Sequence, residues 1–180
     1  YLLDHKKFLD KREKGAWKNK KNWHAYVYEK NLEMFVKPHI VTCVLANRSS
    51  FTLDQNGIYY FVGGGGSGGY GISIKADSEI SLHYLCGLLN SSLLDWIVRK
   101  KTSKFHGGYF TYAKRFIKDL PIQIPNKKNL ELVKNIEKLV KEMEEVEANR
   151  IEKLEDELDQ NVFELYGIVE DERNLIKSSL

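Results

Sequence analysis

Residues 85–125 constrain the fold most, because four kinds of segment follow one another there. They read LCGLLNSSLLDWIVRKKTSKFHGGYFTYAKRFIKDLPIQIP. A helix-like apolar part that ends in Leu-Asn-Ser leads into a basic run. A Gly-Gly-aromatic segment typical of a strand follows, and then an exit that contains two prolines. Such an order predicts a chain that mixes helices and strands.

Serine residues mark where the helices of this stretch begin. Ser78 or Ser81 can cap a helix over residues 82–90, and Ser91 or Ser92 can cap a second one over residues 93–98. We expect both helices to pack on one face of a sheet.

The strands of that sheet are predicted by β-branched runs and turn residues. Residues 39–46, 70–76 and 108–112 each read as a strand. Residues 51–62 carry Asn56-Gly57 between two apolar arms, which predicts a hairpin. The glycine run at 63–69 is followed by no Gly-Lys-Ser/Thr, so we interpret it as a flexible connection and not a phosphate loop. The expected fold class is α+β, with a mixed, largely antiparallel sheet, packed helices and a long helical segment at the C-terminal end.

The charge divides the chain in two. Residues 1–128 hold 21 Lys/Arg and 10 Asp/Glu, a difference of +11, whereas residues 129–180 hold 7 and 15, a difference of −8. We therefore expect a basic recognition domain over 1–128 and an acidic helical spacer or tail over 129–180, with Asn126 able to cap the first tail helix. The apolar pattern of the tail changes phase near residues 147–150, where a helix either continues through a stutter or turns back as a hairpin.

Several function classes lack their residue patterns in this sequence. No apolar run is long enough for a membrane span, no metal-ligand spacing is present, and we predict no catalytic residue. Neither a flipped-base Asn-Pro-Pro-aromatic motif nor a Gly-x-Gly cofactor loop occurs. We expect a cytoplasmic, non-enzymatic fragment with no cofactor of its own.

Basic residues interleaved with aromatic ones indicate nucleic acid as the partner, because ammonium and guanidinium groups meet phosphates and rings stack on bases. One cluster lies among tryptophans near the start, one arginine stands in a turn, and the others flank the Gly-Gly-Tyr segment. The predicted DNA-binding residues are Lys18, Lys20, Lys21, Arg48, Lys101, Lys104, His106, Tyr109, Lys114 and Arg115.

Short motifs in a fixed order carry a family resemblance from about residue 35 to the end. They are residues 37–41 (KPHIV), 51–60 (FTLDQNGIYY), 84–91 (YLCGLLNS), 107–109 (GGY), 120–122 (LPI) and 158–168 (LDQNVFELYGI). In this order they resemble the TaqI-like C-terminal specificity domain of N6-adenine DNA methyltransferases, which include fused type II restriction-modification enzymes.

The resemblance implies a target recognition domain that holds duplex DNA for an N-terminal methyltransferase domain absent from this sequence. That domain would bind S-adenosylmethionine and methylate DNA. Two alternatives remain open: a fragment of the specificity subunit of a multisubunit (type I) restriction system, with residues 129–165 as a spacer, and an RNA-binding or assembly module that does not bind DNA.

Overall fold

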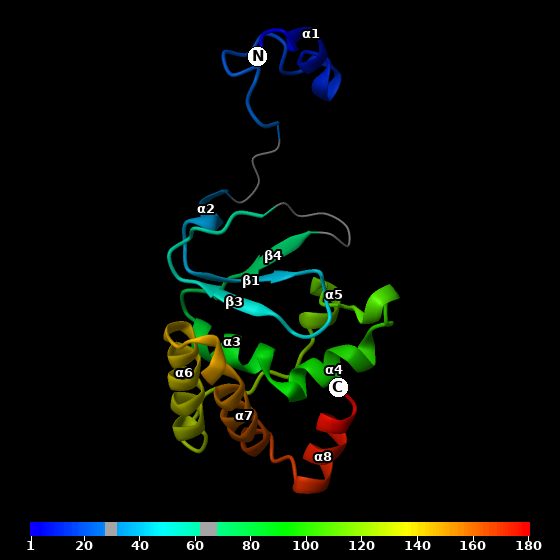
Figure 1. The fold of residues 1–180 in the computed structure, drawn as a ribbon. Coiled ribbons are helices and arrows are strands. Elements are labelled where there is room, and N and C mark those ends of the chain that lie inside the picture. Colours follow the sequence, from blue (N-terminus) through cyan, green and yellow to red (C-terminus); the bar gives the residue numbers. More distant parts are fainter. Residues whose placement is uncertain (28–31, 62–67) are drawn as a thin grey trace. The chain divides into compact units, whose positions relative to one another are not determined.

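A three-stranded sheet organises the larger part of the chain in the computed structural model, which describes residues 1–27, 32–61 and 68–180. Its strands are β1 (His39–Cys43), β3 (Phe51–Asp54) and β4 (Gly69–Ile72), in the order β3-β1-β4. Both neighbouring pairs are antiparallel, with Ile40 opposite Leu53 and Ile72 (Figure 1). The sheet and its packed helices confirm the α+β class.

The run at 39–46 forms two strands where one was predicted. β1 is followed by β2 (Leu45–Ala46), which pairs antiparallel with β5 (Phe110–Thr111). Val44 lies between them and serves both sheets: its N–H donates to the carbonyl of Gly68 at 2.9 Å, and its carbonyl accepts from Tyr112 at 2.8 Å. The chain therefore changes sheets at Val44 without leaving its backbone polar groups unpaired.

The predicted hairpin at Asn56-Gly57 is wrong. Residues 58–61 form no strand, and β3 pairs with β1. The N–H groups of Ile58 and Tyr59 instead donate to the buried Asp54 carboxylate at 3.2 and 2.9 Å. Gly57 has a φ of +63°, and a Cβ there would lie 2.5 Å from the Phe35 carbonyl oxygen, so the glycine permits a close backbone approach.

Two other predicted strands are shorter than expected. β4 covers only the first part of the run at 70–76, and β5 covers two residues of the run at 108–112. Gly108, the first residue of that run, belongs instead to a 3₁₀ turn over His106–Gly108, in which Gly107 and Gly108 adopt φ values of +76° and +85°. Within the glycine run at 63–69, residues 63–67 lie outside the described residues.

Both serine caps are confirmed. Helix α3 (Leu82–Asn90) begins after Ser81, whose side chain accepts from the N–H of Tyr84 at 3.1 Å. Helix α4 (Ser92–Lys101) begins after Ser91, whose side chain accepts from Leu94 at 3.4 Å. The short helix α5 (Lys114–Ile117) follows β5. Helix α3 contacts β1 and β3, so it covers one face of the sheet (Figure 1).

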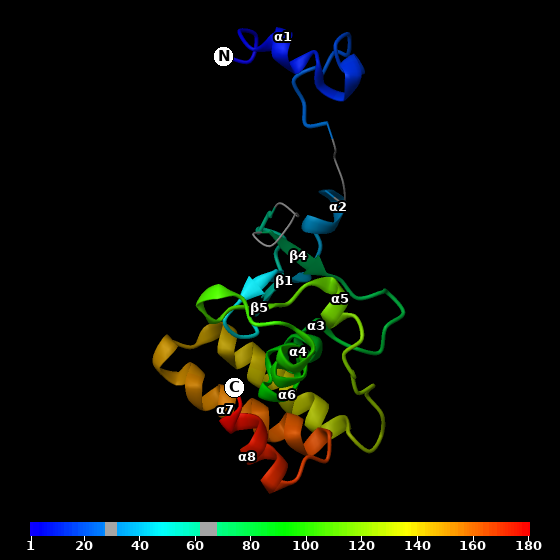
Figure 2. The same cartoon turned by 90° about the vertical axis from the view of Figure 1, so that its right-hand side faces the viewer.

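Three helices form the C-terminal layer: α6 (Leu130–Glu145), α7 (Ala148–Leu165) and α8 (Glu170–Ser178). α6 and α7 turn back on each other and pack against α3 and α4, which separate them from the sheet (Figures 1 and 2). α6 starts four residues later than the expected Asn126 cap, whose side chain accepts from Lys128 instead. Gly167 follows the end of α7 at a φ of +66°, the left-handed conformation that commonly ends a helix.

One core joins the sheet to all of these helices. The side chains in it that are at most 2% exposed are Ile40, Tyr84, Leu88, Leu94, Val98, Tyr112, Ile136, Leu158, Val162 and Phe163. Among the helices that the structure describes, none is long and apolar enough to cross a membrane.

The chain divides into two compact units, Tyr1–Glu33 and Met34–Leu180. The first contains α1 (Lys6–Leu9) and a 3₁₀ turn over Arg12–Gly15, and the short helix α2 (Leu32–Phe35) spans the boundary. The Arg12 guanidinium ties the first unit together by donating to the carbonyls of Leu9, Trp23 and Ala25. The predicted division at residue 128 stays a prediction.

Candidate nucleic-acid interface

Asn90 and Ser91 explain the Leu-Asn-Ser motif in physical terms. The side-chain amide of Asn90 pairs with the backbone of Phe51 in β3: it accepts from the Phe51 N–H at 2.9 Å and donates to its carbonyl at 2.7 Å. Ser91 caps α4 immediately afterwards. Asn90 therefore fixes the end of α3 against β3, and Ser91 begins α4 directly after it, which positions the segment that follows.

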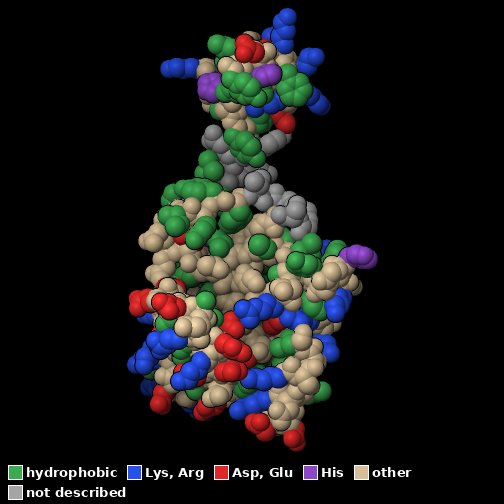
Figure 3. All heavy atoms as spheres, viewed as in Figure 1, with side chains coloured by type: hydrophobic (Ala, Val, Ile, Leu, Met, Phe, Trp, Pro, Cys, Tyr) green, Lys and Arg blue, Asp and Glu red, His purple; other side chains and the backbone are tan. Residues whose placement is uncertain are grey.

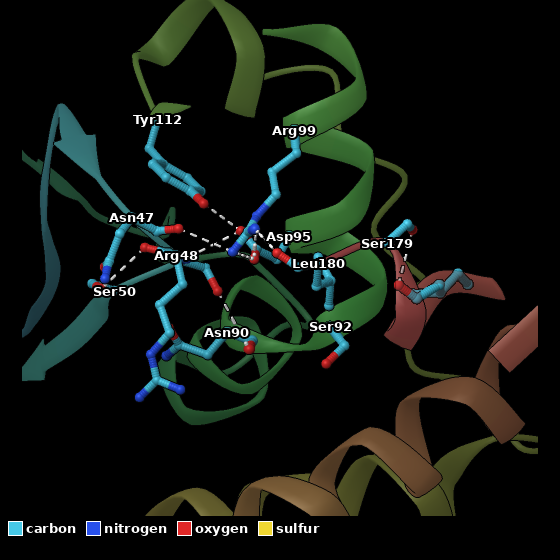
Figure 4. A network of polar contacts seen from close by, with 12 residues as sticks. Asn47, Arg48, Ser50, Asn90, Ser92, Asp95, Arg99, Tyr112, Ser179 and Leu180 are labelled. Atoms are coloured by element: carbon cyan, nitrogen blue, oxygen red, sulfur yellow. Dashed lines mark hydrogen bonds and ion pairs between the residues drawn. The ribbon is translucent and has the colours of Figure 1, made fainter. Parts of the chain in front are cut away.

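Asp95 links α4 to two other parts of the fold (Figure 4). Its buried carboxylate accepts from the Tyr112 hydroxyl, from the Ser49 N–H at 3.0 Å and from the Arg99 guanidinium at 2.9 Å. Burial raises the pKa of Tyr112, and the hydrogen bond to Asp95 raises it further. The two ends of residues 99–112 are thus held to one buried carboxylate, which gives the loop between them a firm base.

The loop itself is short and closed. The Phe105 N–H donates to the Tyr109 carbonyl at 2.7 Å, and the Gly108 N–H donates to the Phe105 carbonyl at 3.2 Å. The two glycines supply the left-handed backbone that so tight a turn requires. Residues 104–107 and 109 are all exposed, so the turn projects from the fold.

Positive charge gathers around this loop. Residues 99–118 contain seven Lys or Arg and no Asp or Glu. Lys101 donates to the Asp119 carbonyl at 3.4 Å, which places the end of α4 beside the end of α5. Six exposed residues of this segment are named here the cationic loop surface: Lys101, Lys104, His106, Tyr109, Lys114 and Arg115.

The cations of the cationic loop surface have no carboxylate partners among the described residues. Neither Lys101, Lys104, Lys114 nor Arg115 has an Asp or Glu oxygen within ion-pairing distance in residues 1–27, 32–61 and 68–180. Arg115 lies over the Phe116 ring at 4.7 Å. Charges that are not neutralised within the fold remain available to the phosphates of a nucleic acid.

Arg48, another predicted DNA-binding residue, lies in different surroundings. Its guanidinium makes two hydrogen bonds to the Glu155 carboxylate of α7, at 3.1 and 3.2 Å. They stand at a cleft of about 430 Å³ whose other lining includes Glu152, Asp156 and Asp159. Acidic and basic side chains mix over the helical layer in Figure 3. This cleft therefore does not resemble a phosphate-binding surface.

Lys18, Lys20 and Lys21 belong to the first unit, where all three side chains are exposed. The Lys20 ammonium lies over the Trp17 ring at 4.2 Å. The DNA-binding role predicted for these three lysines stays a prediction.

Sequence reasoning missed two features of the interface. The role of Asp95 was missed because its partners Ser49 and Tyr112 are distant in the sequence, although Arg99, four residues further along α4, was a local signal for an ion pair. Phe105 is the second missed residue, and its side chain is 52% exposed. Its place between Lys104 and His106 could have indicated that it belongs to the interface. Arg99, by contrast, is occupied by Asp95 and by the carbonyls of Asn47 and Leu180.

The comparison with known proteins agrees with the motifs up to residue 122. The sequence pattern of the TaqI-like C-terminal specificity domain matches residues 1–122. The chain belongs to this family. Within the curated proteins no match was found. The TaqI-like match begins earlier than the resemblance predicted from residue 35 onward, and the tail helices α6–α8 lie outside it.

Membership of the TaqI-like family sets the general function. The chain is a DNA-recognition specificity domain of methyltransferase-type systems, and not a catalytic domain. The cationic loop surface lies wholly within the matched residues.

Proposed function

We propose that the chain binds duplex DNA in a sequence-specific way and that the cationic loop surface makes the contacts. The observation that carries this proposal is a group of four cations, Lys101, Lys104, Lys114 and Arg115, which flank a projecting glycine turn and have no carboxylate partner within residues 1–27, 32–61 and 68–180. Lysines there would neutralise phosphates and fix the position of the DNA, while Arg115 has the planar donor pair that can read guanine.

The proposed partner is an N6-adenine methyltransferase domain that would bind S-adenosylmethionine and modify the DNA held by this domain. The family supports an association with methyltransferases. The role assigned to this chain is to bind and orient DNA in the cytoplasm, without a cofactor of its own.

Salt-dependent binding tests the phosphate contacts. The logarithm of duplex affinity falls with the logarithm of salt concentration by about 0.9 for each phosphate neutralised. The double variant Lys101→Gln/Lys104→Gln should flatten this slope by about two and weaken binding to all duplexes alike. The matched control, Lys134→Gln/Lys138→Gln, removes the same charge from exposed positions of α6 and should leave the slope nearly unchanged. Equal slopes in both variants would exclude the cationic loop surface as the phosphate contact.

Recognition of a specific DNA base sequence requires a separate measurement. Replacing Arg115 by Gln should relax the preference at one base pair, at a cost of about 1–3 kcal/mol, whereas the lysine variants should leave preferences intact. Binding of a randomised duplex library, followed by sequencing of the bound fraction, distinguishes these outcomes.

The alternative functions receive less support. A spacer that measures between half-sites needs an extended helical segment, but α6 and α7 fold back on α3 and α4. An RNA-binding module would be favoured instead by tight binding to folded RNA together with no shift of duplex DNA at low salt.

A further inference from the structure

We propose that Phe105 and Tyr109 form a stacking site for unpaired DNA bases, so that the domain binds a duplex with an unpaired base more tightly than a fully paired one. This inference deepens the proposed function and rests on it. It assigns the two rings at the tip of the loop a role that the surrounding cations cannot fill.

Both rings are free to meet a ligand. Phe105 is 52% and Tyr109 is 47% exposed. Among the described residues, neither ring takes part in an aromatic pair or lies beneath a cation. The neighbouring Phe110 differs: it is half-buried, and the Arg99 guanidinium covers its ring at 4.7 Å.

The turn holds the two rings on one small element. The hydrogen bond from the Phe105 N–H to the Tyr109 carbonyl, 2.7 Å long, brings their backbones side by side. A Cβ on Gly107 would lie 3.4 Å from Cδ2 of Tyr109, so this ring rests against the glycine turn. Asp95 and Tyr112 anchor the base of the loop. The loop therefore loses little conformational freedom when the two rings bind a ligand.

The charges around the rings select the class of partner. No Asp or Glu occurs in residues 99–118, and the flanking Lys104 and Lys114 have no carboxylate partner among the described residues. Exposed rings among unpaired cations suit a polyanion that also offers flat apolar faces. In a fully paired duplex, neighbouring bases cover those faces and only base edges are accessible in the grooves. An unpaired base can leave the stack, which makes its face available to a ring.

The test compares two short DNA duplexes with the full chain. One is fully paired, and the other carries a single unpaired 2-aminopurine, whose fluorescence reports stacking. The unchanged chain should bind the second duplex more tightly and alter its fluorescence. Phe105→Ala and Tyr109→Ala should each reduce this preference about tenfold, while the affinity for the paired duplex changes much less. Tyr109→Phe keeps the ring and should keep the preference.

Tyr59→Ala serves as the matched control, because Tyr59 is 53% exposed and lies outside the cationic loop surface. This variant should behave like the unchanged chain, and circular dichroism spectra should be the same for all variants. Binding to both duplexes with equal affinity would overturn the stacking site and leave the proposed function standing. Absence of duplex binding at low salt would instead overturn the proposed function. Ring-dependent binding that favours single-stranded RNA over DNA would overturn DNA as the ligand.

Discussion

Asp95 shows how one residue can determine the position of a binding surface that it does not itself form. The Asp95 side chain is about 5% exposed and accepts hydrogen bonds from Ser49, Arg99 and Tyr112. These donors come from the β2–β3 turn, from α4 and from the residue after β5. Buried donors that lose their acceptor are costly, so Asp95 should matter more to stability than any exposed carboxylate.

We expect Asp95→Ala to lower the free energy of unfolding by about 3–5 kcal/mol, because it leaves the largely buried Arg99 guanidinium without its carboxylate. Asp95→Asn keeps one oxygen acceptor but turns an amide donor toward Arg99, so it should cost about 1–3 kcal/mol. Urea denaturation measures both values. Asp119→Asn, at an exposed carboxylate, is the control and should change stability by less than about 0.5 kcal/mol. Equal stabilities of the Ala variant and the control would contradict this role.

Asp54 predicts a pH dependence of stability. Burial alone would raise its pKa, but the N–H groups of Tyr59 and Ile58 and the nearby His39 outweigh burial, and the pKa lies below its ordinary value of 3.8. A lowered pKa in the folded state means that ionised Asp54 stabilises the fold above the ordinary value, and that this contribution is lost as the pH falls through the folded-state pKa. The difference in unfolding free energy between the unchanged chain and Asp54→Asn should therefore be larger at pH 7 than at pH 3. A difference that stays constant over this range would refute the assignment.

At the scale of the element, α3 owes its close packing to one glycine. A Cβ on Gly87 would lie 2.7 Å from Cγ2 of Ile136 and 3.0 Å from Cγ2 of Val140, both on α6. These methyl groups belong to β-branched side chains, which have few alternative rotamers inside a helix. The absence of a side chain at residue 87 thus lets α6 approach α3.

Gly87→Ala should therefore destabilise the fold, although alanine is the better helix former by about 1 kcal/mol. The overpacking costs about 1–3 kcal/mol, which equals or exceeds that gain. Gly167→Ala is the informative comparison, because no atom lies within 4 Å of its Cβ position and only its φ of +66° resists the change. Thermal unfolding compares the stabilities of the two variants, and near-ultraviolet circular dichroism should show altered side-chain packing for the first variant alone. If Gly87→Ala stabilises the fold, α6 must be able to shift away from α3 at no cost in free energy.

At the scale of the whole molecule, the acidic helices are part of the core. Ile136 and Val162 are fully buried and Leu158 is 2% exposed, and α6 and α7 pack on α3 and α4. The buried carboxylate of Asp159 accepts from the N–H of Ser92 at 2.8 Å, which joins α7 to the start of α4. The charge difference between the two parts of the sequence therefore does not correspond to separate cores.

We predict that residues 34–128 alone do not unfold cooperatively, whereas residues 34–180 do. Removal of α6–α8 would expose the apolar faces of α3 and α4, at a cost of about 25 cal/mol for each Å² of apolar surface. Near-ultraviolet circular dichroism and urea denaturation of the two fragments make the comparison. A cooperative transition in the shorter fragment would contradict this prediction and favour the predicted division at residue 128.

The amino-acid sequence by itself determined the parts that depend on neighbours along the chain. Ser81 and Ser91 capped their helices, Gly167 ended α7, and the charge of residues 99–118 was visible without coordinates. Each of these depends on one turn of backbone or on composition, so local chemistry suffices to predict it.

Only the tertiary structure decided which distant groups meet. It directed the N–H groups after Asn56-Gly57 to Asp54 instead of to a second hairpin strand, and it divided the run at 39–46 where Val44 bonds to two sheets. It placed Arg48 against Glu155, 107 residues away, and gave the cations of the cationic loop surface no such partner in the part of the chain that the structure describes. Long-range pairing of buried donors and charges depends on how the helical layer packs on the sheet, and no short stretch of sequence contains that information.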